Sequence, residues 1–270
     1  MEARASAPVP RSHRNRAYTV RVKLPFALAL LLVTPSVAVA VCSVPQPRLV
    51  CAEYYASRVV VEATLLRTKG ISEKDDPADL TAFVYTLHAT QVLRGTISQT
   101  FRVYEGNDSG RATFGWKNGR SYLLFLFPSF ENRNAWSLDG CGNSGPLGAA
   151  SATLKEIRAL QANKTGMGWI YGIVSGQAFS DGLSGVSVEA RNGTSRYRKE
   201  TDDTGHFRIE VPVGTYSLRA TRTGMSFVAA DISYSGPERL RVFSGGCVQV
   251  QLAPGGKVAP RSNEKKSGRD

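Results

Sequence analysis

From Trp169 to Leu252 the sequence is a succession of strand-length segments separated by residues that favour turns. The segments are WIYGIVSG, GVSVEARNG, RYRKETDD, HFRIEVP, GTYSLRAT and RLRVFSGGCVQVQL. Short β-rich runs that recur between Gly, Pro, Asp and Asn are typical of a β-sandwich, because each turn returns the chain to the same two layers. We therefore predict a β-sandwich over residues 168–254.

The stretch TDDTGHFRIEVPVGTYSLRA at residues 201–220 concentrates acidic residues and a histidine. Asp202 and Asp203 can accept hydrogen bonds from nearby backbone amides, and Gly205 can adopt a positive φ, which is turn chemistry. Alternation then places Phe207, Ile209 and Val211 on one face and His206, Arg208 and Glu210 on the solvent face. A calcium loop needs more oxygen ligands in a fixed order. The stretch predicts a turn between strands, without a bound metal.

Residues 41–162 combine several predicted strands with one helix. SRVVVEATLLR, TAFVYTLHATQVL and RSYLLFLFPSF predict strands, the last too apolar for a sheet edge, and TKGISEKDDPADL predicts a loop. In SATLKEIRALQ, the residues Leu154, Ile157 and Leu160 recur at helical spacing, which predicts an amphipathic helix. NKTGMG contains two glycines, so we predict a linker at residues 163–167. The tail at 255–270 has almost no apolar residues and is predicted to be disordered.

The N-terminal segment, residues 1–40, has the pattern of a secretory signal. Basic residues end at Lys23, the apolar run LPFALALLLV follows, and Ala38 and Ala40 occupy small-residue positions of a cleavage site. A membrane anchor needs about 20 apolar residues, and Pro35 interrupts this run. Lipid attachment at Cys42 is the alternative, although Val41 stands where that signal favours a small residue. We expect a secreted, periplasmic or cell-envelope protein with no stable membrane span after signal cleavage.

An exported chain would expose its four cysteines, Cys42, Cys51, Cys141 and Cys247, to an oxidising compartment in which disulfides persist. Four cysteines allow three connectivities, and the sequence does not choose among them. Zinc is not expected, because no two cysteines have C-x₂-C spacing and only His88 and His206 follow the signal.

Charge and motifs argue against nucleic-acid binding and catalysis. The formal net charge is +12, but much of it lies before residue 24 and after residue 256, so the body is only mildly basic and lacks an obvious basic stripe. His88 lies within a predicted strand and His206 beside a turn. No G-x-S-x-G occurs, and no glycine-rich loop precedes a helix. We predict no enzymatic activity and no catalytic, cofactor-binding or metal-binding residues.

The C-terminal half resembles a known family. GWIYGIVSG, LSGVSVEA and TDDTGHFRIEVPVGTYSLRA are similar to carboxypeptidase regulatory-like domains, which are transthyretin-like sandwiches in many secreted bacterial proteins. The resemblance implies a non-catalytic domain that serves as a scaffold or binds proteins or glycans. Related folds bind carbohydrates through exposed aromatic residues, for which Trp169, Tyr171 and Tyr197 are the candidates, although aromatic residues in strands more often belong to the core.

The N-terminal half resembles another family. VCSVPQPRLVCAEYYASRVVVEATL, GRSYLLFLF and WSLDGCGNSGPLGAASATLKEI are similar to the netrin-type modules of tissue inhibitors of metalloproteinases. The resemblance implies an OB-like barrel with one closing helix. Two cysteines of that family are absent, since Val44 replaces one and RATFGWKNG lacks the other. We expect Cys141 to pair with Cys42 or Cys51, and Cys247 either to link the two domains or to remain a buried thiol.

The expected function is that of a non-catalytic exported binding or scaffold protein with an unknown protein or glycan ligand. A carbohydrate-binding protein is the first alternative. A metalloprotease inhibitor is the second, since the free N-terminal cysteine of the animal inhibitors chelates the protease zinc. That role would fall on Cys42 and requires cleavage immediately before it. A hydrolase would need convergent titratable groups in a cleft.

Overall fold

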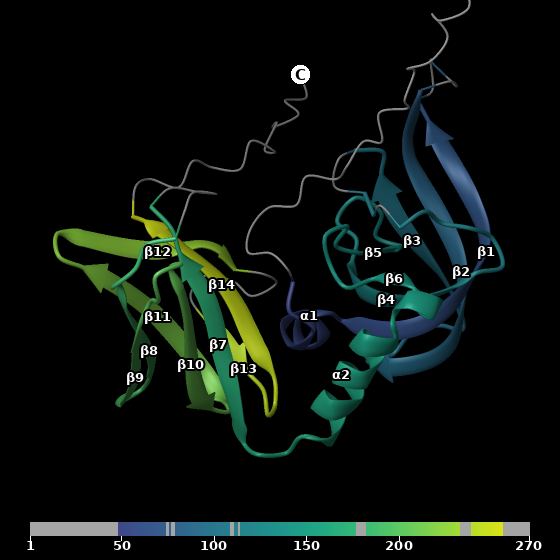
Figure 1. Ribbon diagram of the computed structural model, residues 1–270. Coiled ribbons are helices and arrows are strands. Elements are labelled where there is room, and N and C mark those ends of the chain that lie inside the picture. The colour runs from purple at the N-terminus through teal and green to yellow at the C-terminus, as the bar shows by residue number, and fades with distance from the viewer. Residues whose placement is uncertain are drawn as a thin grey trace, which may run out of the picture. The chain divides into compact units, whose positions relative to one another are not determined.

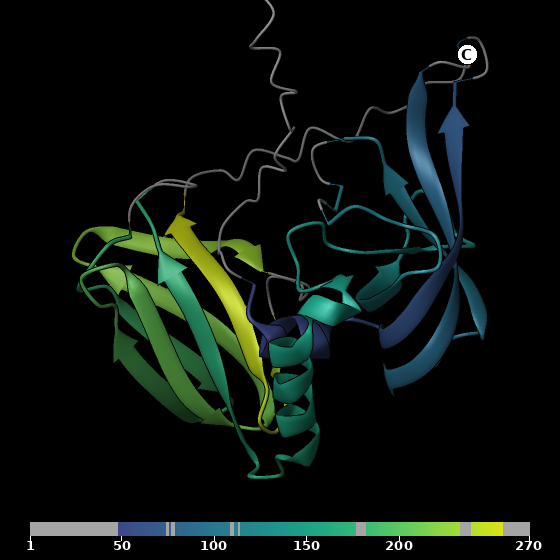
Figure 2. The same cartoon turned by 45° about the vertical axis from the view of Figure 1, so that its right-hand side comes forward.

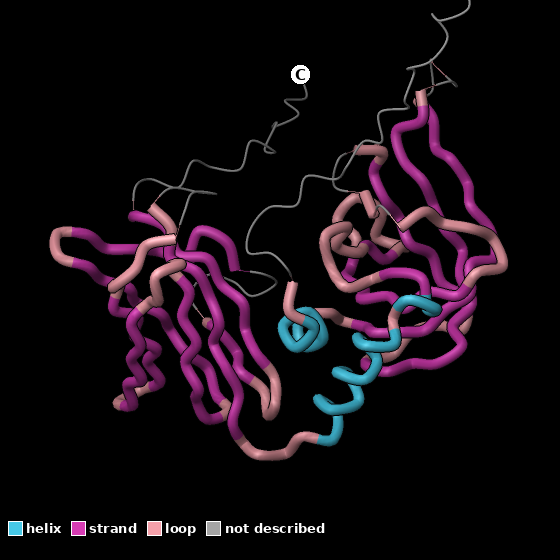
Figure 3. Tube along the Cα trace, viewed as in Figure 1, coloured by secondary structure: helices cyan, strands magenta, loops and turns pink. Residues whose placement is uncertain are grey.

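Strands dominate the computed structural model, as the tube in Figure 3 shows. It describes residues 48–255 apart from 74–75, 77–78, 109–110, 113, 177–181 and 233–238. All of these residues belong to one compact unit. The predicted signal, Cys42 and nearly all of the predicted tail lie outside the described residues.

The first sheet closes on itself into a barrel-like ring. Its strands are β1 (Val59–Ser72), β2 (Leu80–Arg94), β3 (Thr100–Gly106), β4 (Ser121–Pro128), β5 (Trp136–Ser137) and β6 (Gly145–Pro146). The strand order is β1-β2-β3-β5-β4-β6, and β1 also pairs with β4 (Figure 1). The β3–β5 pairing is parallel and the other pairings are antiparallel. The prediction of an all-β protein with a barrel-like region is confirmed.

The strand β4 and the first residues of β1, Val59–Val61, are covered on both faces, which explains why these segments are almost entirely apolar. Val61 of β1 and Leu124 of β4 point into the barrel core. Val60, Leu123 and Phe125 point the opposite way and form a second cluster with the helices. A strand that is buried on both faces has no need of polar alternation.

Two helices cover that outer surface. They are α1 (Val50–Ala56) and α2 (Ser151–Ala162), with the short 3₁₀ turn η1 (Leu147–Ala149) leading into α2. Ile157 and Leu160 of α2 are buried and Leu154 is partly buried, as the helical spacing predicts. Figure 2 shows α1 beside α2, with which it is in contact. The barrel thus has the expected closing helix, with α1 as a second helix on the same surface.

The second sheet has eight strands and surrounds its own core. The strands are β7 (Met167–Val174), β8 (Ser187–Asn192), β9 (Ser195–Glu200), β10 (His206–Pro212), β11 (Gly214–Arg222), β12 (Met225–Ile232), β13 (Leu240–Val242) and β14 (Cys247–Pro254). The order is β10-β7-β14-β12-β11-β8-β9, and β13 pairs with β11. Inward residues of these strands, among them Ile170, Val188, Tyr216 and Val250, form a single hydrophobic cluster.

The predicted turn before β10 is confirmed in detail. Gly205 has a φ of 79°. Oδ1 of Asp202 accepts hydrogen bonds from the backbone N–H of Thr204 and of His206, both at 2.9 Å. Phe207 then begins the buried set of β10, and Glu210 is exposed. Asp202 therefore organises this turn.

The loop predicted at residues 68–80 was too long. Thr68 to Ser72 belong to β1 and pair with β2, with Thr68 opposite Tyr85 and Gly70 opposite Phe83. Charged residues mark exposure, and an exposed two-stranded ribbon satisfies its backbone hydrogen bonds as well as a buried one does.

None of the helices in the described ranges is long and apolar enough to span a membrane. The linker at 163–167 and the domain boundaries stay predictions.

Candidate functional site

A disulfide joins the helix α1 to the first residue of β14. Cys51 and Cys247 form it across a sequence separation of 196 residues, with Cα atoms 5.3 Å apart. Of the two roles expected for Cys247, the structure therefore shows the link between the barrel side and the sandwich side. The option that Cys141 pairs with Cys51 is wrong, because Cys51 is already used. Cys141 is itself disulfide-bonded, and no free cysteine occurs among the residues described.

Two further contacts reinforce this link. The backbone N–H of Leu49 donates a hydrogen bond of 3.0 Å to Oε1 of Gln249 in β14. The hydroxyl of Tyr55 donates one of 2.9 Å to the carbonyl oxygen of Ser244. The ring of Tyr55 also stacks on Phe243, with centroids 4.6 Å apart and planes at 7°. The junction therefore combines a covalent bond with directional polar and aromatic contacts.

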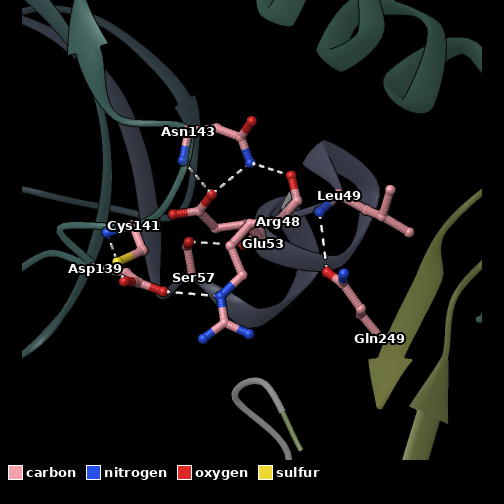
Figure 4. A network of polar contacts seen from close by, with 8 residues as sticks. All are labelled: Arg48, Leu49, Glu53, Ser57, Asp139, Cys141, Asn143 and Gln249. Carbon is pink, nitrogen blue, oxygen red and sulfur yellow. Dashed lines mark hydrogen bonds and ion pairs between the residues drawn. The ribbon is translucent and has the colours of Figure 1, made fainter. Parts of the chain in front are cut away.

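Glu53, on the same helix, is fully buried and is held by the loop that contains Cys141. Its Oε2 accepts hydrogen bonds from the backbone N–H of Asn143 at 2.6 Å and from Nδ2 of Asn143 at 2.7 Å (Figure 4). Nδ2 also donates to the carbonyl oxygen of Arg48 at 3.0 Å. Among the described residues, Oε1 of Glu53 has no hydrogen-bond partner. Gly142 lies so close that a Cβ there would stand 2.1 Å from this oxygen.

Burial raises the pKa of Glu53 from its ordinary value of 4.5 to about 7. The largest cause of the raised pKa is desolvation, because a buried carboxylate loses the water molecules that stabilise its negative charge. The hydrogen bonds from Asn143 lower the pKa and the nearby Asp139 raises it, while Arg48 lowers it. The shift moves the titration of this buried carboxyl toward neutral pH.

An ion pair completes the network beside Glu53. Nε of Arg48 lies 3.2 Å from Oδ2 of Asp139. The other oxygen of Asp139 accepts a hydrogen bond of 2.9 Å from the backbone N–H of Cys141 (Figure 4). The start of α1, the cysteine-bearing loop and β14 are thus connected by side chains as well as by the disulfide.

A second buried carboxyl, Glu105, lies in the barrel. Oε1 accepts a hydrogen bond of 2.9 Å from the backbone N–H of Ala112, and Oε2 accepts one of 2.7 Å from Nε1 of Trp116. The Trp116 ring stacks on Tyr85 with centroids 4.4 Å apart. Burial raises the pKa of Glu105, although these hydrogen bonds lower it. The carboxyl anchors the aromatic interior of the barrel.

The three aromatic residues predicted to face a ligand do not lie together. Trp169 and Tyr171 are partly buried on the outward face of β7, where the Arg208 guanidinium lies 4.6 Å above the Trp169 ring and His206 stacks on Tyr171. Tyr197 packs against the sandwich core and contacts Tyr216 edge to face. A ligand-facing role stays a prediction for all three residues.

No group of three or more His, Cys, Asp or Glu side chains that could hold a metal occurs in the described part of the chain. His88 lies within β2 and His206 is bonded to the hydroxyl of Thr204. Sequence reasoning missed Glu53, Asn143 and Gln249. Their partners lie 90 and 200 residues away, so the local sequence carried no signal for them.

Comparisons with known proteins do not assign the chain to a family. No protein-family model matches it, and no curated protein matches it. The chain is similar to the minor pilin GBS52 of Streptococcus agalactiae at 14% identity, covering 76% of this chain and 87% of that chain, with a TM-score of 0.26. It is similar to a C-terminal fragment of the pilus adhesin SpaC of Lactobacillus rhamnosus GG at 10% identity, covering 78% and 93%, with a TM-score of 0.23. TM-scores this low carry no argument.

Proposed function

We propose that this chain is a non-catalytic exported binding or scaffold protein of the cell envelope or extracellular space. The observation that carries this proposal is the Cys51–Cys247 disulfide, which fixes the barrel side to the sandwich side. The disulfide supports an oxidising compartment, because cytosolic reductants keep most thiols reduced. The disulfide between α1 and β14 supports a role in which a binding surface is held in a fixed position and does not depend on movement of one part of the chain against the other.

The resemblances to netrin-type modules and to carboxypeptidase regulatory-like domains agree with this proposal. Both resemblances imply modules that bind partners or serve as scaffolds. The buried carboxyls agree with a structural role, because Glu53 accepts hydrogen bonds from Asn143, and Glu105 accepts them from the Ala112 backbone and from Trp116.

The test is the intact mass of the exported full-length chain, with and without reduction and alkylation. We expect no alkylation before reduction and a non-reduced tryptic peptide that joins Cys51 to Cys247. Free thiols at these two positions in the exported protein would contradict the proposal of a scaffold that is fixed by this disulfide. The same mass gives the N-terminal residue, and a chain that begins at Val41 argues against zinc chelation by Cys42.

Carbohydrate binding through aromatic residues is a second candidate, supported by the position of Trp169 and Tyr171 on the outward face of β7. A glycan array with the wild-type chain and with Trp169→Ala tests it. We expect the wild type to bind carbohydrates on the array and the Trp169→Ala variant to lose that binding. Equal binding by both proteins would show that Trp169 does not contact carbohydrate.

A further inference from the structure

One face of the sandwich carries an unusual density of arginine residues. The strands β8, β9, β11 and β13 alternate inward and outward residues, and we call the outward surface that they share the arginine face. Its arginine side chains are those of Arg191, Arg196, Arg198, Arg219 and Arg241, together with Arg239, which directly precedes β13 and lines the same pocket as Arg241. Tyr216 and Leu240, from the inward positions of the same strands, are buried in the core.

Strand register places these arginines side by side. Arg196 of β9 is directly opposite Arg191 of β8, which in turn is opposite Ser217 of β11. In the next outward row, Arg198 and Arg219 lie on either side of Glu189. Neighbouring strands are about 4.8 Å apart and outward residues of one strand about 7 Å apart, so the guanidinium groups form a two-dimensional array.

Two carboxylates lie among these arginines, Glu189 in the second row and Glu200, opposite Ser187, in the third. Glu189 binds both Arg191 and Arg198, and these bonds lower its pKa, so it stays ionised. Among the described residues, no carboxylate forms an ion pair with Arg196, Arg219 or Arg239, all of which are exposed. Like charges opposite each other across strands are unfavourable. An anion bound to this face would relieve that repulsion.

Protection of a sheet edge does not explain the pattern. β9 is the last strand in the order, and charged residues on an edge strand discourage pairing with other chains. That reasoning accounts for Arg196 and Arg198. It does not account for Arg219, since β11 is paired on both sides, nor for Arg239 and Arg241 on a different part of the sheet.

An open pocket of about 610 Å³ lies within the arginine face. It is lined by the three arginines Arg191, Arg239 and Arg241, by the hydroxyl residues Thr215 and Ser217, and by Asn192, Gly193 and Tyr216. No carboxylate lines it. The lining is therefore rich in hydrogen-bond donors, and guanidinium groups bind planar oxyanions through two parallel hydrogen bonds.

We propose that the arginine face binds an anionic polysaccharide through its carboxylate or sulfate groups. Single-stranded nucleic acid needs aromatic rings on which bases stack, and the tyrosines of these strands, Tyr197 and Tyr216, pack with the core. An acidic peptide added to the β9 edge would reach Arg196 and Arg198, but Arg219 and Arg239 lie two or more strands away. A flexible polyanion that crosses the strands contacts all of them.

The experiment measures binding of the full-length disulfide-bonded chain to immobilised alginate and dextran sulfate, with neutral dextran, poly-L-glutamate and oligo-dT as comparison ligands. The variant is the triple substitution Arg196→Gln, Arg219→Gln and Arg239→Gln, none of which touches the core. The matched control removes three exposed arginines outside the sandwich, through Arg67→Gln, Arg102→Gln and Arg158→Gln. Both triple variants have the same net charge.

We expect the wild type to bind alginate or dextran sulfate and to lose affinity as salt rises, because screening weakens exposed ion pairs. The face variant should bind at least about tenfold more weakly, and the control within about twofold of the wild type. Absence of polysaccharide binding, equal loss in both triple variants, or tighter binding of poly-L-glutamate or oligo-dT would overturn the proposal. The inference rests on the proposed binding role, but a failure here leaves the mass analysis of the disulfide unaffected.

Discussion

Asn143 donates two hydrogen bonds to a single oxygen of Glu53, although the two residues are 90 positions apart in the sequence. One comes from its backbone N–H and the other from its side-chain amide. Because Glu53 is in α1 and Asn143 follows Cys141, this pair holds the cysteine-bearing loop against the helix that carries Cys51. The carboxyl is thus a structural anchor at the junction.

The raised pKa of Glu53 predicts a pH-dependent stability. The folded chain binds the Glu53 proton more tightly than the unfolded chain, with pKa values of about 7 and 4.5. Its stabilising contribution is therefore complete below pH 4.5 and is lost as the pH rises to about 7. The full difference is on the order of 3 kcal/mol.

Urea denaturation at pH 5 and pH 8 measures this effect. Glu53→Gln should reduce the difference between the two pH values, while Glu156→Gln, an exposed position on α2, should preserve it. An unchanged pH dependence in Glu53→Gln would show that another group is responsible.

The close approach of Gly142 to Glu53 predicts intolerance of a side chain at that position. Gly142→Ala would place a Cβ 2.1 Å from Oε1, so the carboxyl or the loop must move. We expect a loss of about 1–3 kcal/mol in the free energy of unfolding. Gly145→Ala is the matched control, since a Cβ there meets nothing within 4 Å. Equal stability of the two variants would contradict the packing of this loop.

The disulfide predicts a large loss of stability on removal. Cys51→Ser together with Cys247→Ser should lower the free energy of unfolding by about 2–5 kcal/mol, because the bond restricts the unfolded chain. Limited proteolysis should also become faster at residues 163–166, between α2 and β7. The measurement is chemical denaturation combined with mass spectrometry of the digest. A double variant with the same free energy of unfolding and the same resistance to proteolysis as the wild type would show that the disulfide does not contribute to the stability of the junction.

The Tyr55 hydroxyl contributes separately from its ring. Tyr55→Phe keeps the stack on Phe243 and removes the hydrogen bond to Ser244, for an expected loss of about 1 kcal/mol. Tyr55→Ala removes both contacts and should cost more. Tyr171→Phe is the control, since no hydrogen bond from its hydroxyl occurs within the described residues, and it should change stability by less than about 0.5 kcal/mol. A Tyr55→Phe variant as stable as the wild type would show that the hydrogen bond to Ser244 does not contribute to the stability of the junction.

Local sequence patterns were sufficient where the determining interactions are local. Asp202 and Gly205 predicted their turn because a carboxylate can bond amides two and four residues ahead, and glycine tolerates a positive φ. The apolar run of β4 predicted an interior strand because such a run needs cover on both faces. The extension of β1 through Ser72 was missed because pairing with β2, and not composition, decides it.

The sequence by itself determined the all-β character, the alternation that separates inward from outward residues, and the position of the helix α2. These follow from steric and hydrophobic rules that act within a few residues. Only the tertiary structure decided that Cys51 bonds Cys247, that Asn143 reaches Glu53, and that Arg196, Arg191 and Ser217 share one row. Those relationships depend on strand register and chain topology, which place residues far apart in the sequence within bonding distance.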